Sequence, residues 1–477
     1  MFSKGAIDED EALLKKPRSA AQCIGWMGSL VLLINTIVGP GIVALPWMYA
    51  TAGCLATTVG IALASVVALQ AMYAMIEATR EMPGNSALTR PLAFGDPVAE
   101  HIGSRVAKVA RSAFYVAIVL NTIATIAPAA AAIDEICAFV TGHAYAFVCS
   151  GSQAGTFLAW TNDCADCIEP FYSGESPMPV ADYVLSLGYV LLVALCLPFC
   201  FGGVCDQMAL QYASFGVLVA AVAIYAVYAT VGVVERGAAD VPVVLAWTAI
   251  VRLPGTLVFN VCTYTVLATA WLSEKASGVP PEGVARTASV ASALVFIVFG
   301  LTLALAFGTD VTLDVGEFLA ERDRPLYVRV ATYVFSLGVL ISGIPVNMIM
   351  MRDDLRAAGA GRRTADFYAL CVPWLLSWLA YESAAFGALV DLTGLLVVAP
   401  LALLAPLLVY MALEAPPPSG FFSVVAWWCV ALDEPVCAPA WDLPRGRRSR
   451  RGSAAWLALL VAVFIMAAAV GGVAKYV

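Results

Sequence analysis

Residues 34–47, INTIVGPGIVALPW, are almost wholly apolar but carry Gly39-Pro40-Gly41 at their centre. If this run crosses a membrane, every backbone N–H and C=O group must find a partner within the protein, because lipid offers none. Proline lacks an N–H and glycine is a poor helix former, so the triplet favours an interruption of the helix. Backbone groups released there could bind a ligand. The alternative is a plain proline kink, in which neighbouring helices satisfy the freed groups.

The rest of the sequence offers little other chemistry. It has 2 histidines, and neither lies in a long apolar run. No nucleophile, base and acid combine into a catalytic constellation, and no phosphate-binding loop is present. Cys164-x-x-Cys167 has only His143 nearby, which is a poor zinc pattern. We therefore expect a protein that is not an enzyme, that needs no cofactor and, with a net charge of −8, that does not bind nucleic acid.

The composition predicts an all-α integral membrane protein. The chain of 477 residues is 61% hydrophobic and 13% charged, against about 25% charged in soluble domains. The uncharged run 19–76 is long enough for two spans, because one crossing needs about 20 residues. Nine further spans are expected at 112–133, 183–205, 207–234, 253–274, 287–309, 330–351, 367–381, 392–413 and 452–474. Residues 419–432 are too short to span and contain Trp427-Trp428, which indicates an interfacial helix.

The distribution of positive charge predicts the orientation. With the N-terminus in the cytoplasm, all but six of the 26 lysines and arginines fall in cytoplasmic segments. The C-terminus is then outside or lumenal. The tail is too acidic for a signal or transit peptide. In the predicted outer loop 142–181, Cys149, Cys164 and Cys167 favour a structural disulfide whose pairing the sequence leaves open.

The spans divide into two halves of five, residues 24–234 and 245–413. An odd number of spans gives the halves opposite topologies, which is typical of an inverted repeat with the ligand between broken helices. We expect a cytoplasmic tail at 1–23, a transporter core at 24–413, a cytoplasmic loop with the interfacial helix at 414–451, and an eleventh transmembrane helix at 452–477.

The first span resembles a known family. The pattern Asn35-x-Ile37-Val38-Gly39-x-Gly41-Ile42-x-x-Leu45-Pro46, followed by Ala52-Gly53, is similar to the signature of the amino acid/auxin permease family. That family includes sodium-coupled and proton-coupled neutral amino acid transporters and vacuolar amino acid transporters. Weaker matches follow in the right order at Asp134, 258–267, Phe307-Gly308, 344–352 and 392–394.

The resemblance implies the leucine-transporter type of fold, a 5+5 inverted repeat with discontinuous helices 1 and 6. The broken first span would offer N–H groups and a positive helix end to the substrate carboxylate. Span 6 would face the amine and the side chain. The expected substrate-binding residues are Thr36, Gly39, Pro40, Gly41, Ile42, Phe259, Asn260, Cys262 and Thr263. Pro40 departs from the small residue usual in the family.

Two features of the site stay open at this stage. Thr263, Tyr264 and Ala268 stand where many relatives have histidine and prolines, so span 6 could instead be an ordinary helix whose threonines bond back to their own carbonyls. The coupling ion is H+ or Na+. Asn35 and Ser342 are the candidate sodium ligands, although Ser342 is slightly out of register with the family. Glu382 is the candidate proton carrier near the membrane interior.

These features predict a secondary active transporter of amino acids, with small neutral ones favoured, acting by alternating access in the lipid bilayer. A channel would need polar rings along several spans, whereas most span faces here are Ala, Val and Leu. The alternative is a transporter-like amino acid sensor. Glu9-Asp10-Glu11-Ala12-Leu13-Leu14 has the spacing of an endosomal, lysosomal or vacuolar sorting signal. We therefore expect the protein in an endosomal, lysosomal or vacuolar membrane, or in the plasma membrane.

Overall fold

Helices make up most of the protein that the computed structural model describes. The described residues are 23–149, 155–161, 184–242, 257, 261–312, 315–321, 323–379, 397–414 and 454–462. The tail up to residue 22, with its acidic dileucine motif, and the predicted interfacial helix lie outside them. Residues 454–462 are helical and are the described part of the predicted eleventh span.

The described part of the N-terminal half contains seven α-helices and the 3₁₀ helix that follows the first of them. They are α2 (Trp26–Ile37), η1 (Pro40–Ala44), α3 (Leu45–Ala52), α4 (Cys54–Arg80), α5 (Gly95–His101), α6 (Ser104–Thr141), α7 (Leu187–Cys196) and α8 (Met208–Arg236). Short 3₁₀ turns, η2 (Leu197–Phe201) and η3 (Cys205–Gln207), connect α7 to α8.

The second half continues in the same manner. Its elements are η4 (Thr263–Thr265), α11 (Ala268–Glu274), α12 (Pro281–Phe307), η5 (Gly308–Asp310), α13 (Val315–Ala320), α14 (Leu326–Ala357), α15 (Arg362–Leu370), α16 (Val372–Leu379), the π-helical η7 (Pro400–Leu404) and α18 (Ala405–Glu414).

Several of these helices can cross a membrane. Within the described residues, five helices are long and apolar enough, and the bent pair formed by 26–37 and 41–52 would make a sixth span. Shorter apolar helices cover Leu187–Phe201 and Pro400–Leu413, where spans 4 and 10 are expected. The chain is therefore a multi-pass membrane protein. The total of eleven spans stays a prediction.

The spanning helices are longer than the uncharged runs that predicted them. The third span was expected at 112–133, and α6 extends from Ser104 to Thr141. Its first two turns contain Arg105, Lys108 and Arg111. A spanning helix can include such residues at its end because their long side chains reach the headgroup region. Uncharged length thus located this span but underestimated the helix.

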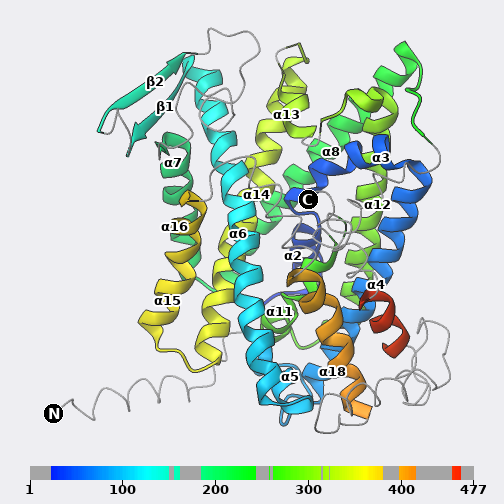
Figure 1. Cartoon of the computed structure of the whole chain (residues 1–477), viewed down its shortest axis with the longest axis vertical. Coiled ribbons are helices and arrows are strands. Elements are labelled where there is room, and N and C mark those ends of the chain that lie inside the picture. Colours follow the sequence, from blue (N-terminus) through cyan, green and yellow to red (C-terminus); the bar gives the residue numbers. More distant parts are fainter. Residues whose placement is uncertain are drawn as a thin grey trace, which may run out of the picture.

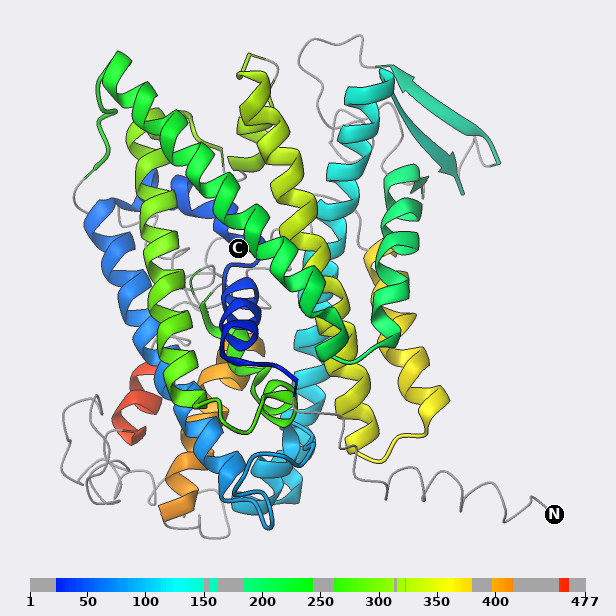
Figure 2. The ribbon, with the colours of Figure 1, turned by 180° about the vertical axis from the view of Figure 1, so that it is seen from behind.

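The long helices surround the first span. α2 packs against α8, α12 and α14, and it lies near the centre of the bundle in both side views (Figures 1 and 2). α6 and α14 pack along each other, with α7 and α16 on the far side of α6. α3 packs closely on α12 at Gly300, where a Cβ would lie 2.7 Å from the ring of Tyr49. The broken helix is therefore the inner element of the fold.

A small sheet covers the end of α6 opposite to α5. Strand β1 (His143–Val148) lies between β2 (Phe157–Thr161) and β3 (Val184–Ser186), antiparallel to both. Ala146 pairs with Leu158 on one side and with Ser186 on the other. The sequence analysis predicted a loop here and no strands. Cys149, which follows β1, is a free thiol, while Cys164 and Cys167 fall in the part of the loop that is not described.

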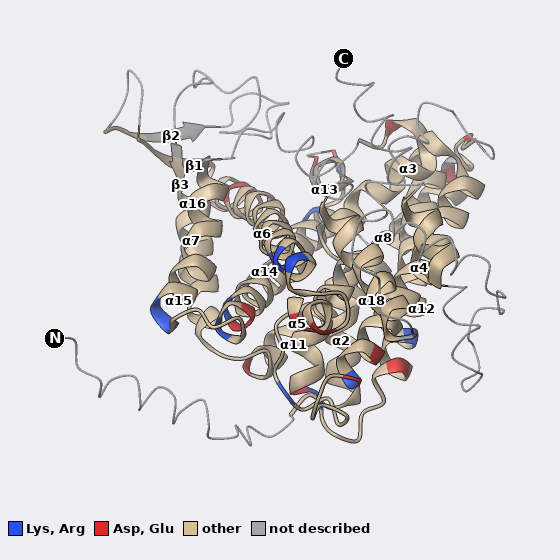
Figure 3. Ribbon diagram, turned by 60° about the horizontal axis from the view of Figure 1, so that its bottom comes forward, with Lys and Arg blue, Asp and Glu red and all other residues tan. Residues whose placement is uncertain are grey.

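Charged residues gather at the opposite end of the bundle, around α5, α11 and α15 (Figure 3). Arg80 at the end of α4 pairs with Glu282 at the start of α12 over 2.5 Å. Arg111 on α6 pairs with Asp96 on α5 over 2.9 Å. This is the end that the positive-inside rule places in the cytoplasm, and we call it the basic end.

Candidate functional site

The first span is broken in the middle of the bundle. α2 ends at Ile37, and Val38 leaves the helical region with φ −84° and ψ 53°. Gly39 is extended, and the chain then continues as η1 from Pro40 and as α3 from Leu45. The two halves are bent by 51°. A kink in a continuous helix would keep the backbone helical on both sides, so the interruption at Gly39 is a true break.

The break presents backbone groups of both kinds. The last carbonyls of α2 have no donor within their own helix, and the first N–H groups of η1 have no acceptor within theirs. Pro40 takes the first position of η1, where its missing N–H costs nothing. The N–H of Ile42 lies 3.3 Å from the Gly39 carbonyl oxygen, a long bond, and the N–H of Gly41 belongs to the same first turn. Such an N-terminus can bind a carboxylate.

Four of the predicted contact residues at this break can be placed further. Gly39 and Gly41 are half-buried, whereas Ile42 is fully buried. A Cβ on Gly39 would meet only the Thr36 carbonyl oxygen, at 3.8 Å, so the space beside this glycine is open. The Thr36 hydroxyl donates to the Leu32 carbonyl at 2.8 Å, within its own helix. The backbone at Gly39 and Gly41 is thus the more accessible part of the site.

The sixth span is also irregular, and it lies beside the first. Val261 and Cys262 are helical, η4 follows as a 3₁₀ turn, residues 266 and 267 form a turn, and α11 begins only at Ala268. η4 packs against α2. Cys262 is fully buried, whereas Phe259 and Asn260 lie outside the described part of this span. The alternative of one ordinary helix does not hold for residues 261–274.

The π-helix η7 of the tenth span packs against η4 of the sixth span. The Thr265 hydroxyl lies 2.8 Å from the carbonyl oxygen of Cys262 and 2.8 Å from that of Ala402 in η7. A π-turn leaves backbone groups displaced from the regular helical pattern and is frequent at functional sites. The sequence analysis expected a regular span here, because the run 392–413 shows no local signal of a π-turn other than Pro400.

The candidate ion ligands belong to a buried polar network. Asn35 on α2 donates from Nδ2 to the backbone oxygen and to Oε1 of Gln211, each at 2.9 Å. Gln211 on α8 donates from Nε2 to the carbonyl oxygen of Ser342 at 3.0 Å. The Ser342 hydroxyl lies 2.9 Å from that of Ser214. The structure therefore brings Asn35 and Ser342 into one network, through a glutamine that the sequence analysis missed.

The missed residue had a visible signal. Gln211 and Ser214 are polar side chains within a mostly apolar span, and a buried polar group needs a partner. Asn35 Oδ1 is buried and has no hydrogen-bond partner in the described part of the chain. Among the groups named in this network, the side-chain oxygen of Asn35 is thus the acceptor that has no donor within the described residues.

Asp134 and Glu382 are acidic residues next to predicted spans, and only Asp134 belongs to the described part of the chain. Asp134 on α6 accepts a hydrogen bond from the N–H of Gly188 at 2.7 Å, in the first turn of α7. A Cβ on Gly188 would lie 2.7 Å from the Asp134 carboxyl carbon, so the glycine allows this close approach. Asp134 thereby satisfies a free N–H group in the first turn of α7, which is a structural role. Glu382 falls between the described segments 323–379 and 397–414.

Comparison with known families supports the resemblance of the first spans. The sequence profile described as transmembrane amino acid transporter protein matches residues 22–161. This segment contains the broken first span, α4, α6 and the outer strands β1 and β2. The predicted resemblance to the amino acid permease family is confirmed over this part of the chain. Among curated proteins, none matches the sequence.

Solved structures show the fold over most of the chain. MhsT in complex with L-phenylalanine is similar over 94% of this chain and 98% of its own, with a TM-score of 0.58 and 12% identity. The manganese transporter of Eremococcus coleocola, in complex with an aromatic bis-isothiourea substituted compound, covers 94% and 95% with a TM-score of 0.52 and 12% identity. The predicted leucine-transporter type of fold is confirmed.

Proposed function

We propose that this protein is a secondary active transporter that moves amino acids, small neutral ones first of all, across a membrane by alternating access. The observation that carries the proposal is the break at Gly39, which presents backbone N–H groups beside the irregular stretch of the sixth span. A carboxylate at Gly41 and an amine near η4 would match the two ends of a zwitterion. The family match over 22–161 and the L-phenylalanine bound to the similarly folded MhsT agree with this ligand class.

The coupling ion that we favour is the proton. Sodium needs several free oxygens, but the Ser342 carbonyl and Gln211 Oε1 already accept hydrogen bonds from Gln211 and Asn35. Asn35 Oδ1 is the acceptor that this network leaves over. The amide N–H groups of Asn35 and Gln211 thus occupy oxygens that a sodium ion would otherwise coordinate.

The test is a flux measurement on the purified protein in proteoliposomes. Labelled L-alanine and L-phenylalanine are offered with an imposed proton gradient, with a sodium gradient and with neither. We expect concentrative uptake of at least one of them that a proton ionophore abolishes. Binding without any flux would overturn the transporter proposal in favour of an amino acid sensor, and the absence of both would refute the ligand class.

The topology and the location belong to the same proposal. We place the basic end and the N-terminus in the cytoplasm, with the halves 24–234 and 245–413 as the two inverted repeats. An internal acidic compartment would supply the proton gradient, and the dileucine motif of the tail would direct the protein there.

A further inference from the structure

Two cysteines lie together at the basic end of the first span. Cys23, just before α2, and Cys205, at the start of η3, are joined in a disulfide although 182 residues separate them. Their Cα atoms are 6.2 Å apart, within the range that a disulfide spans. Cys23 is exposed and Cys205 is half-buried, so a small molecule can reach the pair from solvent.

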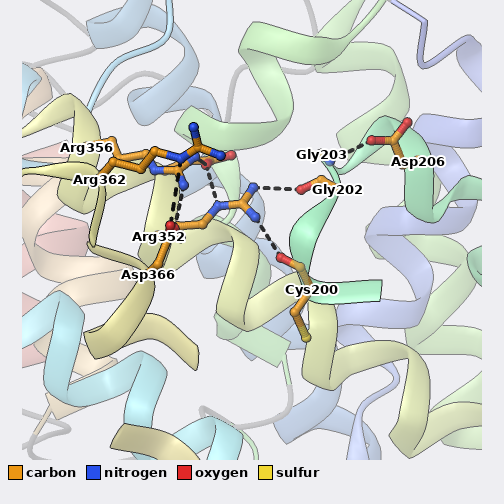
Figure 4. Close-up of polar contacts among 9 residues, drawn as sticks. Cys200, Gly202, Gly203, Asp206, Arg352, Arg356, Arg362 and Asp366 are labelled. Carbon is orange, nitrogen blue, oxygen red and sulfur yellow. Dashed lines mark hydrogen bonds and ion pairs between the residues drawn. The ribbon is translucent and has the colours of Figure 1, made fainter. Parts of the chain in front are cut away.

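Cys205 belongs to a turn that is fixed to the scaffold. The buried guanidinium of Arg352 on α14 donates from Nη1 to the Cys200 carbonyl and from Nη2 to the Gly202 carbonyl, each at 2.6 Å (Figure 4). Asp206 accepts from the N–H of Gly203 at 2.8 Å in the same turn. Charge-assisted bonds of this kind are stronger than neutral ones. The turn between α7 and α8 therefore moves with α14.

Cys23 belongs to the end of the broken helix. Next to it, the carbonyl of Ile24 accepts from the N–H of Ala276 at 2.9 Å, and the N–H of Ile24 lies 3.3 Å from the Glu274 carbonyl. The Glu274 carboxylate in turn accepts from the N–H of Cys205 at 2.8 Å. We call this contact of residues 23–24, 205 and 274–276 the foot contact. It closes the basic end of α2 against α11 and the fixed turn.

The foot contact closes the inner end of a helix that leads to the candidate site. α2 extends from Trp26 to the break at Val38, and the bend there separates it from α3. To open the site toward the basic end, α2 must part from α11 and from the fixed turn. Each neutral hydrogen bond of the foot contact contributes only about 0.5–1.5 kcal/mol net. Such bonds can break during a transport cycle, whereas a disulfide cannot open without a chemical reaction.

We propose that Cys23 and Cys205 form a redox-modification site that controls this gate, with small-molecule disulfides such as oxidised glutathione as its reactant. As a disulfide the pair holds the foot contact closed, and as two thiols it lets α2 move. The gating role rests on the proposed transport function. A dithiol–disulfide pair in a reducing compartment is typically transient and regulatory rather than structural, and the positive-inside rule places this end in the cytoplasm.

The reaction is a thiol–disulfide exchange with two steps. One cysteine thiolate attacks a sulfur of the oxidised glutathione, which forms a mixed disulfide and releases one glutathione thiolate. The second cysteine thiolate attacks the protein sulfur of that mixed disulfide and releases the second. The two cysteines are oxidised by two electrons, glutathione disulfide is reduced to two glutathione molecules, and these take up the two protons of the cysteines.

The experiment compares the wild type with Cys23→Ser and Cys205→Ser in proteoliposomes. Cys371→Ser, which replaces an exposed free cysteine between α15 and α16, is the matched control. Each protein is treated with oxidised glutathione and then with dithiothreitol, and the initial uptake of labelled L-alanine and L-phenylalanine is measured. We expect oxidation to lower the uptake of the wild type and of the control by about tenfold or more and dithiothreitol to restore it. Cys23→Ser and Cys205→Ser should each transport at the same rate after oxidised glutathione as after dithiothreitol.

Two further measurements separate this proposal from the transport proposal. Peptide mapping by mass spectrometry shows whether a bond between Cys23 and Cys205 forms. Hydrogen exchange of the α2 amides in detergent reports the opening of the foot contact without any substrate, and we expect slower exchange in the oxidised protein. If the bond fails to form, or if it forms and leaves both uptake and exchange unchanged, the redox gate is wrong. If oxidation slows the exchange of α2 but neither the wild type nor any variant takes up amino acids, the redox site stands and the transport function is wrong.

Discussion

Replacing Gly39 by alanine should weaken amino acid binding while the fold stays intact. Gly39 has φ −75° and ψ −162°, an extended conformation that alanine also adopts. The new methyl group would have the Thr36 carbonyl oxygen as its nearest neighbour, at 3.8 Å, which is an ordinary contact. The free protein therefore has room for the change.

The bound ligand would not have that room. A carboxylate that accepts a hydrogen bond from the backbone approaches to about 2.7–3.2 Å, whereas a methyl carbon holds other atoms about 3.5–4.0 Å away. A displacement of this size disrupts a hydrogen bond to a charged group, which is worth about 1.5–3 kcal/mol. We expect the Kd to rise by about 10- to 150-fold.

Binding of labelled L-alanine and L-phenylalanine to the purified protein checks this value. Gly343→Ala on α14 is the matched control, because its Cβ would meet only a methyl group of Thr125, at 3.9 Å. Its Kd should equal that of the wild type, and neither variant should unfold at a lower temperature than the wild type. Gly41→Val, with a branched Cβ next to the proposed N–H donors, should lose uptake while it still inserts in the membrane. Unchanged affinity in Gly39→Ala together with normal uptake by Gly41→Val would refute the ligand site at the break.

Three other predictions concern coupling, stability and location. Uptake should persist when choline replaces sodium and should rise when the side of entry is acidified; a strict sodium requirement without any effect of pH contradicts proton coupling. Asn35→Ala and Gln211→Ala should each lower the unfolding temperature, and their double-mutant cycle should show a coupling of about 0.5–3 kcal/mol, because both lose the buried bond from Asn35 Nδ2 to Gln211 Oε1; strictly additive effects would mean that this bond contributes nothing to stability. Changing Leu13 and Leu14 to alanine should move a tagged protein from internal membranes to the plasma membrane, and an identical distribution of wild type and variant rejects the sorting signal.

Local properties of the sequence determined the class of the protein and the place of its break. Whether a segment can cross a membrane depends on its own uncharged length, so the runs at 287–309 and 330–351 predicted α12 and α14. The absence of an N–H on Pro40 and the freedom of Gly39 and Gly41 also act within one short segment. For this reason the interruption of the first span and its similarity to amino acid permeases could be predicted from residues 34–53.

Contacts between distant segments were decided only by the tertiary structure. Gln211 lies 176 positions after Asn35 and bonds to it because α8 packs against α2. In the outer loop Cys149 is free, and Cys164 and Cys167 lie outside the described residues, so a disulfide there stays a prediction, whereas the structure joins Cys23 to Cys205. Hydrogen bonds and disulfides depend on which helices become neighbours, and helix association in lipid rests on close packing between distant segments, which no short stretch of sequence records. The sequence therefore located the broken helix, while packing chose the partners of Asn35 and of Cys23.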